Sequence, residues 1–196
     1  MFVTNFYPGR LESSVDESLA KLGTDYVDLL LLHWPVAIKP NAAGDFMPLR
    51  PDGTRDLDLA QDANTVVWPL MERLLSSTSK MRAIGVSNWS QPKLEQLLQT
   101  AKVIPAVNQV ELHPLLPQQS LVDFCKANNV LPQAYSPLGS SGGELRDDPE
   151  IGAIANKHGV SPGNVLVSWS VARGIVVLPK SVTPSRIEDN IKCVSR

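Results

Sequence analysis

Cysteine is scarce in this sequence of 196 residues, which contains only Cys125 and Cys193. The two cysteines follow no metal-binding or redox spacing, so neither a disulfide framework nor a cysteine metal site is indicated. Histidine is equally scarce, with three residues in the chain. We therefore expect a reduced, cytoplasmic protein without a bound metal.

An excess of charge of either sign is also missing. The chain has 18 Lys and Arg against 20 Asp and Glu, its net charge is -2, and its basic residues are scattered. Nucleic acids and anionic membranes attract proteins through clustered basic residues. Neither is therefore an expected partner.

Long apolar runs are absent as well, since no stretch reaches the roughly 18 apolar residues of a membrane-spanning helix. The first ten residues, "MFVTNFYPGR", lack the order of charged, apolar and small residues that defines a secretion signal. A composition with 43% hydrophobic and 19% charged residues is that of an ordinary soluble globular domain.

Short apolar runs that suit β-strands alternate with segments of helical period along the whole chain. The predicted strands are 2–4, 26–33, 83–87, 105–110, 130–136 and 175–179. The run 26–33, "YVDLLLLH", is continuously apolar before its end, which is typical of a parallel strand covered on both faces. The alternation predicts six strands, each followed by at least one helix.

The helical segments are recognised by apolar spacing and by capping residues. In the first, Val15, Leu19 and Leu22 fall at i, i+4 and i+7, with Ser13 or Ser14 as the expected cap and Gly23 as the end. Further helices are predicted over 67–75, from Ser90 and Pro92, after Pro117, before Gly159, from Ser161 and Pro162, and from Thr183 and Pro184. The stretch from Pro35 to about Asn64 has no period and is predicted to be a long loop.

Strict alternation of strands and helices indicates parallel strands, either in a doubly wound open sheet or in a (β/α) barrel. His33, Ser87, Gln109, Tyr135 and Lys180 lie at the carboxyl ends of different predicted strands, where barrel enzymes place their active sites. No G-x-G-x-x-G motif follows a strand, so a Rossmann site has no support. We predict a single domain over 1–196 with an incomplete TIM-type (β/α) barrel of about six of the eight βα units.

The strand ends read, in order, "LLHWP", "IGVSNW", "NQVELHP", "AYSPLGS" and "LPKSVTPSRIEDN". Taken together and in this order, they resemble the aldo-keto reductase family, and the resemblance runs from about Leu19 to Cys193. The loop "NAAGDFMPLRPDGTRDLD" is most similar to that of the fungal NADP-dependent alcohol and glycerol dehydrogenase group. The resemblance implies NADPH-dependent reduction of small aldehydes or ketones to alcohols, or the reverse reaction.

The resemblance also implies a role for individual residues of this sequence. His33 matches the histidine that directs the substrate carbonyl, and Trp34 and Trp89 would form apolar walls of the substrate pocket. Tyr135 matches the aromatic residue that stacks on the nicotinamide. The implied cofactor-binding residues are Ser87, Asn88, Gln109, Tyr135, Ser136, Leu138, Lys180, Ser181, Thr183, Arg186, Asp189 and Asn190.

The last of these motifs bears on the choice of cofactor. Lys180, Ser181, Thr183 and Arg186 match residues that surround the adenosine 2′-phosphate, while Asp189 and Asn190 match residues near the adenine. A lysine and a guanidinium beside a helix N-terminus suit a phosphate. NADP is therefore expected in preference to NAD, although Asp189 is shorter than the glutamate of the family.

Other conspicuous side chains have structural interpretations. His113 is expected to be a framework residue, and His158, before Gly159, a favourable charge at a helix C-terminus. Trp68 and Trp169 sit at helical core spacing. Cys125, beside Phe124, is expected to be a buried thiol.

Three of the four catalytic residues that the family uses have no match here. The implied Asp and Tyr belong to a first βα portion that precedes "FVT", and Phe6 stands where the family has its lysine. We accordingly expect a chain shortened at both ends, with open strand edges that favour self-association. Tyr7 is an alternative acid, though without a lysine partner.

Three functional hypotheses remain open at this point. The first is an NADP-dependent aldo-keto reductase acting on small carbonyls or alcohols. The second is a redox-inactive relative that uses His33 for isomerisation, dehydration or cyclisation of a bound ligand. The third is a non-enzymatic binding protein or an incomplete gene product, and the sequence does not identify a physiological substrate.

Overall fold

The computed structural model describes residues 1–139 and 145–192. The chain forms two compact units, Met1–Asn108 and Gln109–Arg196. The single domain expected over 1–196 stays a prediction. No helix within the described ranges combines the length and the apolar character that crossing a membrane requires.

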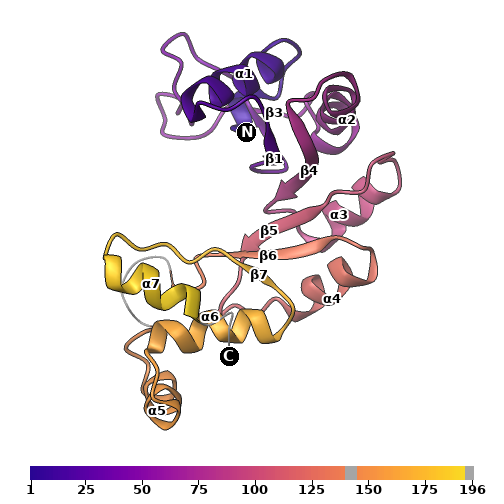
Figure 1. Ribbon diagram of the computed structural model, residues 1–196. Coiled ribbons are helices and arrows are strands. Elements are labelled where there is room, and N and C mark those ends of the chain that lie inside the picture. Colours follow the sequence, from indigo (N-terminus) through magenta and orange to yellow (C-terminus); the bar gives the residue numbers. More distant parts are fainter. Residues whose placement is uncertain (140–144, 193–196) are drawn as a thin grey trace. The chain divides into compact units, whose positions relative to one another are not determined.

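The first unit is built on a parallel strand pair. Strand β1 (Val27–Leu32) runs parallel to β4 (Met81–Ser87), and helix α2 (Trp68–Ser77) packs on β4 (Figure 1). Gly85 allows the strands to approach closely, because a Cβ there would lie 2.8 Å from Leu31 Cδ2 and 3.0 Å from Val107 Cγ2. The parallel arrangement that the alternating sequence predicts is confirmed in this unit.

Strand β1 is less enclosed than its apolar sequence predicts. Leu32 is buried, but Asp28 is exposed and Leu29 to Leu31 are half-buried. The reason is its place at the end of the strand order, where it pairs only with β4 among the described strands. The expectation of a strand covered on both faces is therefore wrong for most of its length.

The expectation of a strand at Phe2–Thr4 is also wrong. Val3–Asn5 forms a 3-10 helix, η1, and helix α1 (Arg10–Leu22) follows it. Three residues are too few for a period to distinguish an extended strand from a turn of 3-10 helix. The first of the six predicted strands is thus not present among the described residues.

Helix α1 ends as predicted but begins earlier. Gly23 terminates it in the left-handed conformation, with φ 66°, which glycine adopts without strain. At the other end, Gly9 precedes the helix and its N–H donates to Glu12 Oε2 at 2.8 Å. The hydroxyls of Ser13 and Ser14 instead donate to carbonyls one turn back within the helix, so neither is the cap.

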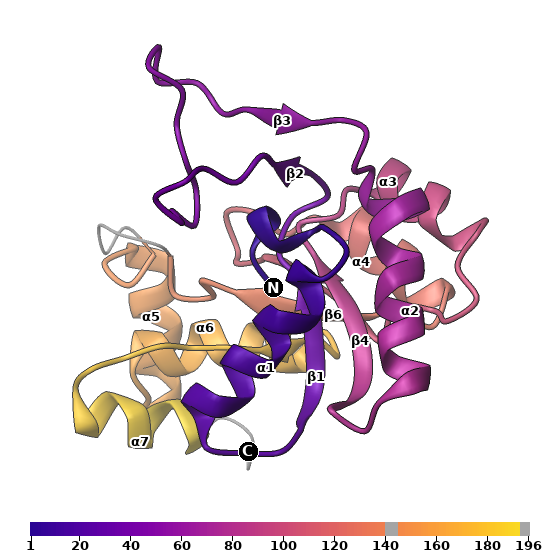
Figure 2. The ribbon, with the colours of Figure 1, turned by 90° about the horizontal axis from the view of Figure 1, so that it is seen from above.

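The predicted loop between Pro35 and Asn64 contains a small hairpin. Strands β2 (Ala37–Ile38) and β3 (Leu57–Asp58) pair in antiparallel fashion (Figure 2). They are followed by a turn of π-helix, η2 (Ala63–Val67), which leads into α2. Strands of two residues have no detectable alternation, which is why the sequence did not reveal them.

Helix α3 (Gln91–Leu98) follows β4, with Ser90 as its N-cap and a proline in its first turn. This agrees with the start predicted at Ser90 and Pro92. Strand β5 (Val107–Glu111) then crosses the boundary between the two units. In the first unit, the N–H of Ala106 donates to the carbonyl of Ile84 in β4 at 2.9 Å.

The second unit carries the rest of β5 together with β6 (Leu131–Tyr135) and β7 (Val176–Val177). Strands β6 and β7 are parallel, with Gln133 opposite Val176. Helix α4 (Gln119–Ala127) packs on β6, as predicted for the segment after Pro117. Strand β7 is shorter than the predicted run 175–179.

Three helices complete the second unit: α5 (Pro149–His158), α6 (Pro162–Ala172) and α7 (Pro184–Lys192). Helix α6 contacts both α5 and α7 (Figure 1). Asp148 caps α5 by accepting from two backbone N–H groups, and Ser161 caps α6 by accepting from that of Asn164. The caps predicted at Ser161 and Pro162 and the helix end at Gly159 are confirmed.

The predicted packing residues are mostly buried. Trp68 and Cys125 have almost no exposed surface, whereas Cys193 lies outside the described residues. Trp169 is half-buried, and the guanidinium of Arg173 covers its ring at 4.1 Å from the centroid. Trp169 is therefore a partly exposed cation–π partner rather than a core residue.

Candidate active site

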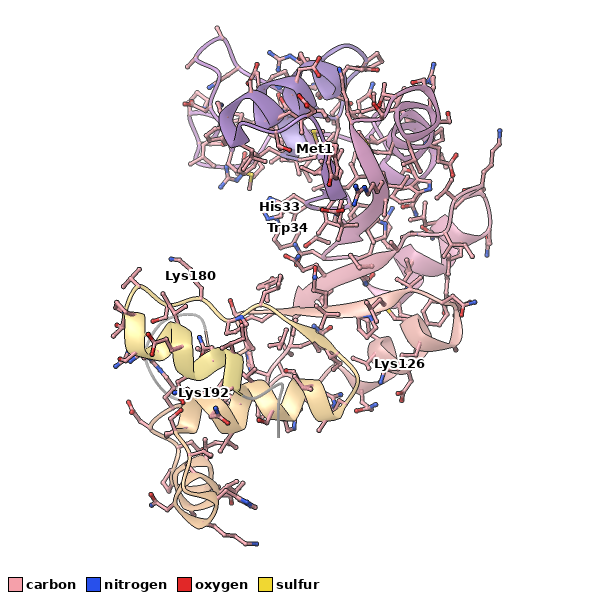
Figure 3. The ribbon with its side chains drawn as sticks, viewed as in Figure 1. Met1, His33, Trp34, Lys126, Lys180 and Lys192 are labelled. Atoms are coloured by element: carbon pink, nitrogen blue, oxygen red, sulfur yellow. The ribbon has the colours of Figure 1, made fainter. Side chains whose placement is uncertain are left out.

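His33 and Trp34 directly follow β1 in the first unit (Figure 3). The imidazole is exposed, its centroid lies 6.3 Å from a Trp34 ring, and the Phe2 ring meets it edge-on at 5.6 Å. Trp34 is 41% exposed, so its indole has surface available for an apolar ligand. The pair forms an aromatic surface at the carboxyl end of the strand.

His33 has a lowered pKa. Partial burial is the main cause, and the positive charge of the Met1 amino group is the second. Both favour the neutral imidazole, which has one nitrogen that donates and one that accepts. The neutral imidazole keeps one N–H, which can donate a hydrogen bond to a carbonyl oxygen.

Ser87 and Asn88 lie at the end of the neighbouring strand β4. The Asn88 side chain donates to the carbonyl oxygen of His33 at 2.8 Å and to Ser87 Oγ at 3.2 Å. Its backbone has φ 67°, a left-handed conformation that asparagine tolerates better than most residues. The structure thus brings His33, Ser87 and Asn88 together.

Trp89 occupies a different environment from the one the resemblance implies. Its side chain is 0% exposed, and its indole N–H donates to Asn64 Oδ1 at 2.9 Å. The Asn108 side chain exchanges two hydrogen bonds with the Trp89 backbone. A fully buried indole has no surface to offer a substrate, so we assign Trp89 to fixing the turn after β4.

Asn64 and Asn108 were not identified as site-related residues from the sequence. Both are buried, and buried amides occur almost only where each has a hydrogen-bonding partner. The position of Asn108 within the apolar run "PAVNQV" is the one feature of the sequence that could have revealed it. Asn64 sits at the end of an irregular stretch and had no such feature.

Tyr7 is held in a way that does not suit an acid catalyst. Its hydroxyl donates to Asp58 Oδ2 at 3.0 Å. Burial, that hydrogen bond and the charges of Asp58 and Asp56 raise its pKa to about 12. An acid that acts near neutrality needs the opposite shift. Phe6, which the resemblance aligns with the lysine of the family, is fully buried.

In the second unit, Gln109 and Tyr135 lie on adjacent strands. Gln109 Nε2 donates to Gln133 Oε1 at 2.6 Å, which fixes the orientation of the amide. Tyr135 is half-buried, and burial followed by the charge of Glu111 raises its pKa. Its ring therefore carries a neutral phenol and keeps partial exposure for stacking.

A pocket of about 660 Å³ lies in the second unit beside α7. Figure 3 shows Lys180 on the segment that leads into α7 and Lys192 at its last turn. Six of the predicted cofactor-binding residues line the pocket: Leu138, Lys180, Ser181, Arg186, Asp189 and Asn190. A pocket of this volume suits a small-molecule ligand or part of a cofactor.

Some predicted residues of this unit contribute differently. Thr183 does not line the pocket, but its carbonyl accepts from the N–H groups of Arg186 and Ile187, and its N–H donates to Ser181 Oγ at 3.1 Å. Thr183 therefore occupies the N-cap position of α7 through its backbone. Gln109, Tyr135 and Ser136 also lie outside the lining of this pocket, and Ser136 has the unusual φ of 48°.

Hydrogen bonds join the wall of the pocket to α6. The Ser161 hydroxyl donates to the Asp189 carboxylate, and Asn164 Nδ2 donates to the Asp189 carbonyl at 3.1 Å. The Asp189 side chain is therefore already engaged with the α6 cap. This geometry fixes α7 against α6 and thereby the position of Arg186, one turn before Asp189.

The pocket also contains residues that the sequence did not point to. They are Arg146, Asp147, Ser161, Pro162, Gly163, Ser185 and Lys192. Ser161 was recognised only as a helix cap. Arg146 lies in an irregular stretch before α5, where no periodicity or motif distinguishes it from any solvated charge.

The predicted site residues therefore fall into two groups. His33, Trp34, Ser87, Asn88 and Trp89 belong to the first unit. The second unit holds Gln109, Tyr135, Ser136, Leu138, Lys180, Ser181, Thr183, Arg186, Asp189 and Asn190. All of these residues except Gln109 lie at or after the carboxyl ends of strands of their own unit, whereas Gln109 lies in the middle of β5.

Comparison with known proteins finds relatives along the whole chain. Residues 3–196 match the aldo/keto reductase family. The chain is 52% identical over 189 residues to a D-galacturonate reductase of Hypocrea jecorina, covering 96% of this chain and 60% of that protein. It is 48% identical over 187 residues to a glycerol 2-dehydrogenase (NADP(+)) of Saccharomyces cerevisiae, covering 92% and 60%. The similarity to fungal dehydrogenases is confirmed.

Solved structures give the same result for the fold. An aldose reductase of Giardia lamblia superposes with a TM-score of 0.91 at 35% identity, covering 100% of this chain and 66% of that one. An aldose reductase of Schistosoma japonicum gives a TM-score of 0.90 at 31% identity, covering 100% and 62%. These matches confirm the incomplete (β/α) barrel.

The chain spans about 60% of the length of the curated relatives it matches. The match nevertheless extends from the first helical turn to the last residues, and it includes both groups of site residues. With a family match over residues 3–196, the chain belongs to the aldo/keto reductase family.

Proposed function

We propose that this chain acts as an NADP-dependent oxidoreductase that reduces small aldehydes or ketones to alcohols, or carries out the reverse reaction. The observation that carries the proposal is the pocket beside α7, which is lined by Lys180, Arg186 and the first turn of the helix. Cationic side chains at a helix N-terminus favour a phosphate group.

The preference for NADP over NAD follows from the same residues. The two cofactors differ by the 2′-phosphate, which is a dianion with three acceptor oxygens near neutral pH. The side chains of Lys180 and Arg186 make no ion pair with another described residue. They are therefore available to pair with such a dianion. A second support is the name of the Saccharomyces cerevisiae relative, which includes NADP(+).

The bound cofactor supplies or accepts the hydride. In the chain itself, the neutral imidazole of His33 donates a hydrogen bond to the carbonyl oxygen and orients the carbonyl. Trp34 covers the apolar part of the substrate. Asn88 holds the His33 backbone in place through its 2.8 Å hydrogen bond.

His33 is assigned to orientation alone. The Tyr7 hydroxyl is bonded to Asp58 and its pKa is raised to about 12, which argues against the alternative that Tyr7 replaces the acid of the family. No described residue is therefore assigned as the proton donor, and the proton that completes the reduction would come from water at the exposed site beside His33.

The substrate class is proposed from the relatives. The names of two of them specify D-galacturonate and glycerol, both polyhydroxylated compounds. We propose a small polyhydroxylated carbonyl compound as the substrate. The cytoplasmic location and self-association through the edge of β1 are proposals as well, and sedimentation of the purified chain at two concentrations tests the latter.

The reduction is tested with purified protein, NADPH and either D-galacturonate or dihydroxyacetone. We expect absorbance of the reduced nicotinamide to fall only when the carbonyl compound is present. His33→Ala should lower kcat/KM about 100-fold, the effect of removing one positioned donor. His158→Ala, which removes an exposed histidine on α5, should leave the rate unchanged.

A flat absorbance trace with intact NADPH binding contradicts the redox proposal. That result would favour a redox-inactive family member in which the pocket binds the cofactor without turning it over. Equal rates for the two histidine variants would contradict the role of His33.

A further inference from the structure

Four cationic residues line the pocket beside α7, of which the resemblance implies only two. Lys180 and Arg186 were predicted to bind phosphate, whereas Arg146 and Lys192 were not. Arg146 precedes α5, so it approaches the pocket from a different segment than the β7–α7 connection. The pocket therefore has basic residues from two separate stretches of the second unit.

The cations of this pocket differ from cations elsewhere in the chain in whether they form ion pairs. Arg82 pairs with Asp28, and Arg50 pairs with Asp56. The side chains of Arg146, Lys180 and Arg186 have no such partner among residues 1–139 and 145–192. Cations that gather without partners around one pocket generate a positive potential there, which an anionic ligand neutralises.

The two acidic residues of the pocket do not remove this potential. The Asp189 carboxylate accepts the Ser161 hydroxyl at the α6 cap, which leaves less of it available to a cation. Asp147 follows Arg146 directly in the sequence, yet the two form no ion pair. The pocket thus has three cations and one carboxylate without an ion-pair partner among the described residues, together with the engaged carboxylate of Asp189.

We propose that Arg146 is a third cationic ligand of the 2′-phosphate, a role that rests on the proposed function of this pocket. A phosphate dianion has three acceptor oxygens, so Lys180 and Arg186 do not exhaust its capacity. The planar guanidinium of Arg146 donates two parallel hydrogen bonds to a phosphate. Arg146 thereby contributes to the discrimination between NADP and NAD.

Lys192 has a different role. It lies in the last turn of α7, where a positive charge complements the helix dipole, and it already takes part in an interaction of its own. Arg186, by contrast, lies in the first turn. The 2′-phosphate therefore binds toward Arg146 and the start of α7 and not toward Lys192.

The inference is tested by calorimetric titration of the complete chain with two probes, adenosine 2′,5′-bisphosphate and 5′-AMP. The probes differ only in the 2′-phosphate. We expect Arg146→Ala to weaken the affinity for the bisphosphate about tenfold, as the loss of one charge-assisted contact implies. The affinity for 5′-AMP should stay within about twofold.

Lys157→Ala is the matched control, because Lys157 is an exposed cation of α5 that does not line the pocket. It should leave both affinities unchanged. Arg146 is exposed as well, so its alanine variant should keep the thermal midpoint of the parent chain. Arg146→Lys, which retains the charge without the bidentate geometry, should give an intermediate loss.

The possible results separate this inference from the function on which it rests. Suppose that the parent chain prefers the bisphosphate, that Arg186→Ala removes this preference, and that Arg146→Ala leaves it intact. That result overturns the role of Arg146 alone. An equal loss of affinity for both probes in Arg146→Ala also overturns this role, since Arg146 would then contact a group other than the 2′-phosphate. Equal affinity of the parent chain for both probes overturns the NADP proposal itself.

Discussion

The position of His33 depends on its neighbour Asn88 at the end of the adjacent strand. The Asn88 amide ties the His33 carbonyl to Ser87, and it does so from a left-handed backbone conformation. Glycine tolerates that conformation but has no side chain. Few other residues combine this tolerance with a side chain that donates a hydrogen bond. The residue type at 88 is thus set by backbone geometry as well as by any contact with a cofactor.

Tyr7 provides a test at the level of one hydroxyl group. Its pKa is raised to about 12 by burial, the Asp58 hydrogen bond and nearby carboxylates. The folded state therefore favours the neutral phenol. The resulting stability is fully present below the unfolded pKa of about 10 and is lost as the pH rises toward 12.

Spectrophotometric titration of the parent chain and of Tyr7→Phe measures this shift. The difference between the two curves should show one phenol ionising near pH 12. Tyr7→Phe should cost about 0.5–1.5 kcal/mol of unfolding free energy at pH 7, the usual contribution of one hydrogen bond. A difference curve centred at or below pH 10 would mean that the Asp58 contact does not hold.

At the level of elements, the junction of α6 and α7 determines the shape of the pocket beside α7. Ser161 caps α6 by accepting from the Asn164 N–H, and its hydroxyl also donates to Asp189 of α7. One side chain therefore stabilises a helix start and the packing of two helices. Its loss should affect both stability and cofactor binding.

We predict that Ser161→Ala lowers the unfolding free energy by about 0.5–2 kcal/mol, the range for losing an N-cap. It should also weaken NADPH binding, because Asp189 and the first turn of α7 lose their anchor. Ser185→Ala is the control, since Ser185 lines the same pocket without a side-chain hydrogen bond to a described residue. Denaturant unfolding of both variants checks the prediction, and equal stabilities would refute the role of the cap.

The helices of the second unit could be predicted well from the sequence, and the physical reason is their caps. Ser161 and Pro162 mark the start of α6, and Gly159 marks the end of α5. The elements that were missed have no such residues. The two-residue strands β2 and β3 are too short to show alternation. The 3-10 turn at Val3–Asn5 is defined by backbone geometry that three residues do not encode.

At the level of the whole molecule, the sequence predicted which residues lie at strand ends but not what surrounds them. The pocket contains Lys180 and Arg186 as expected, because the motif around them is contiguous in the chain. Arg146 joins them only through folding, so no local pattern could reveal it. Trp89 shows the reverse case, since its motif suggested a ligand contact and its burial with Asn64 excludes one.

The central claim is that the pocket beside α7 selects NADP by binding the 2′-phosphate of the cofactor. One measurement tests this claim most directly. NADPH and NADH are titrated against the parent chain and against Arg186→Ala. We predict that the variant loses about 10- to 100-fold in affinity for NADPH, as expected for a bidentate charged contact. Its affinity for NADH should change by less than about twofold. Equal losses for the two cofactors would contradict the account.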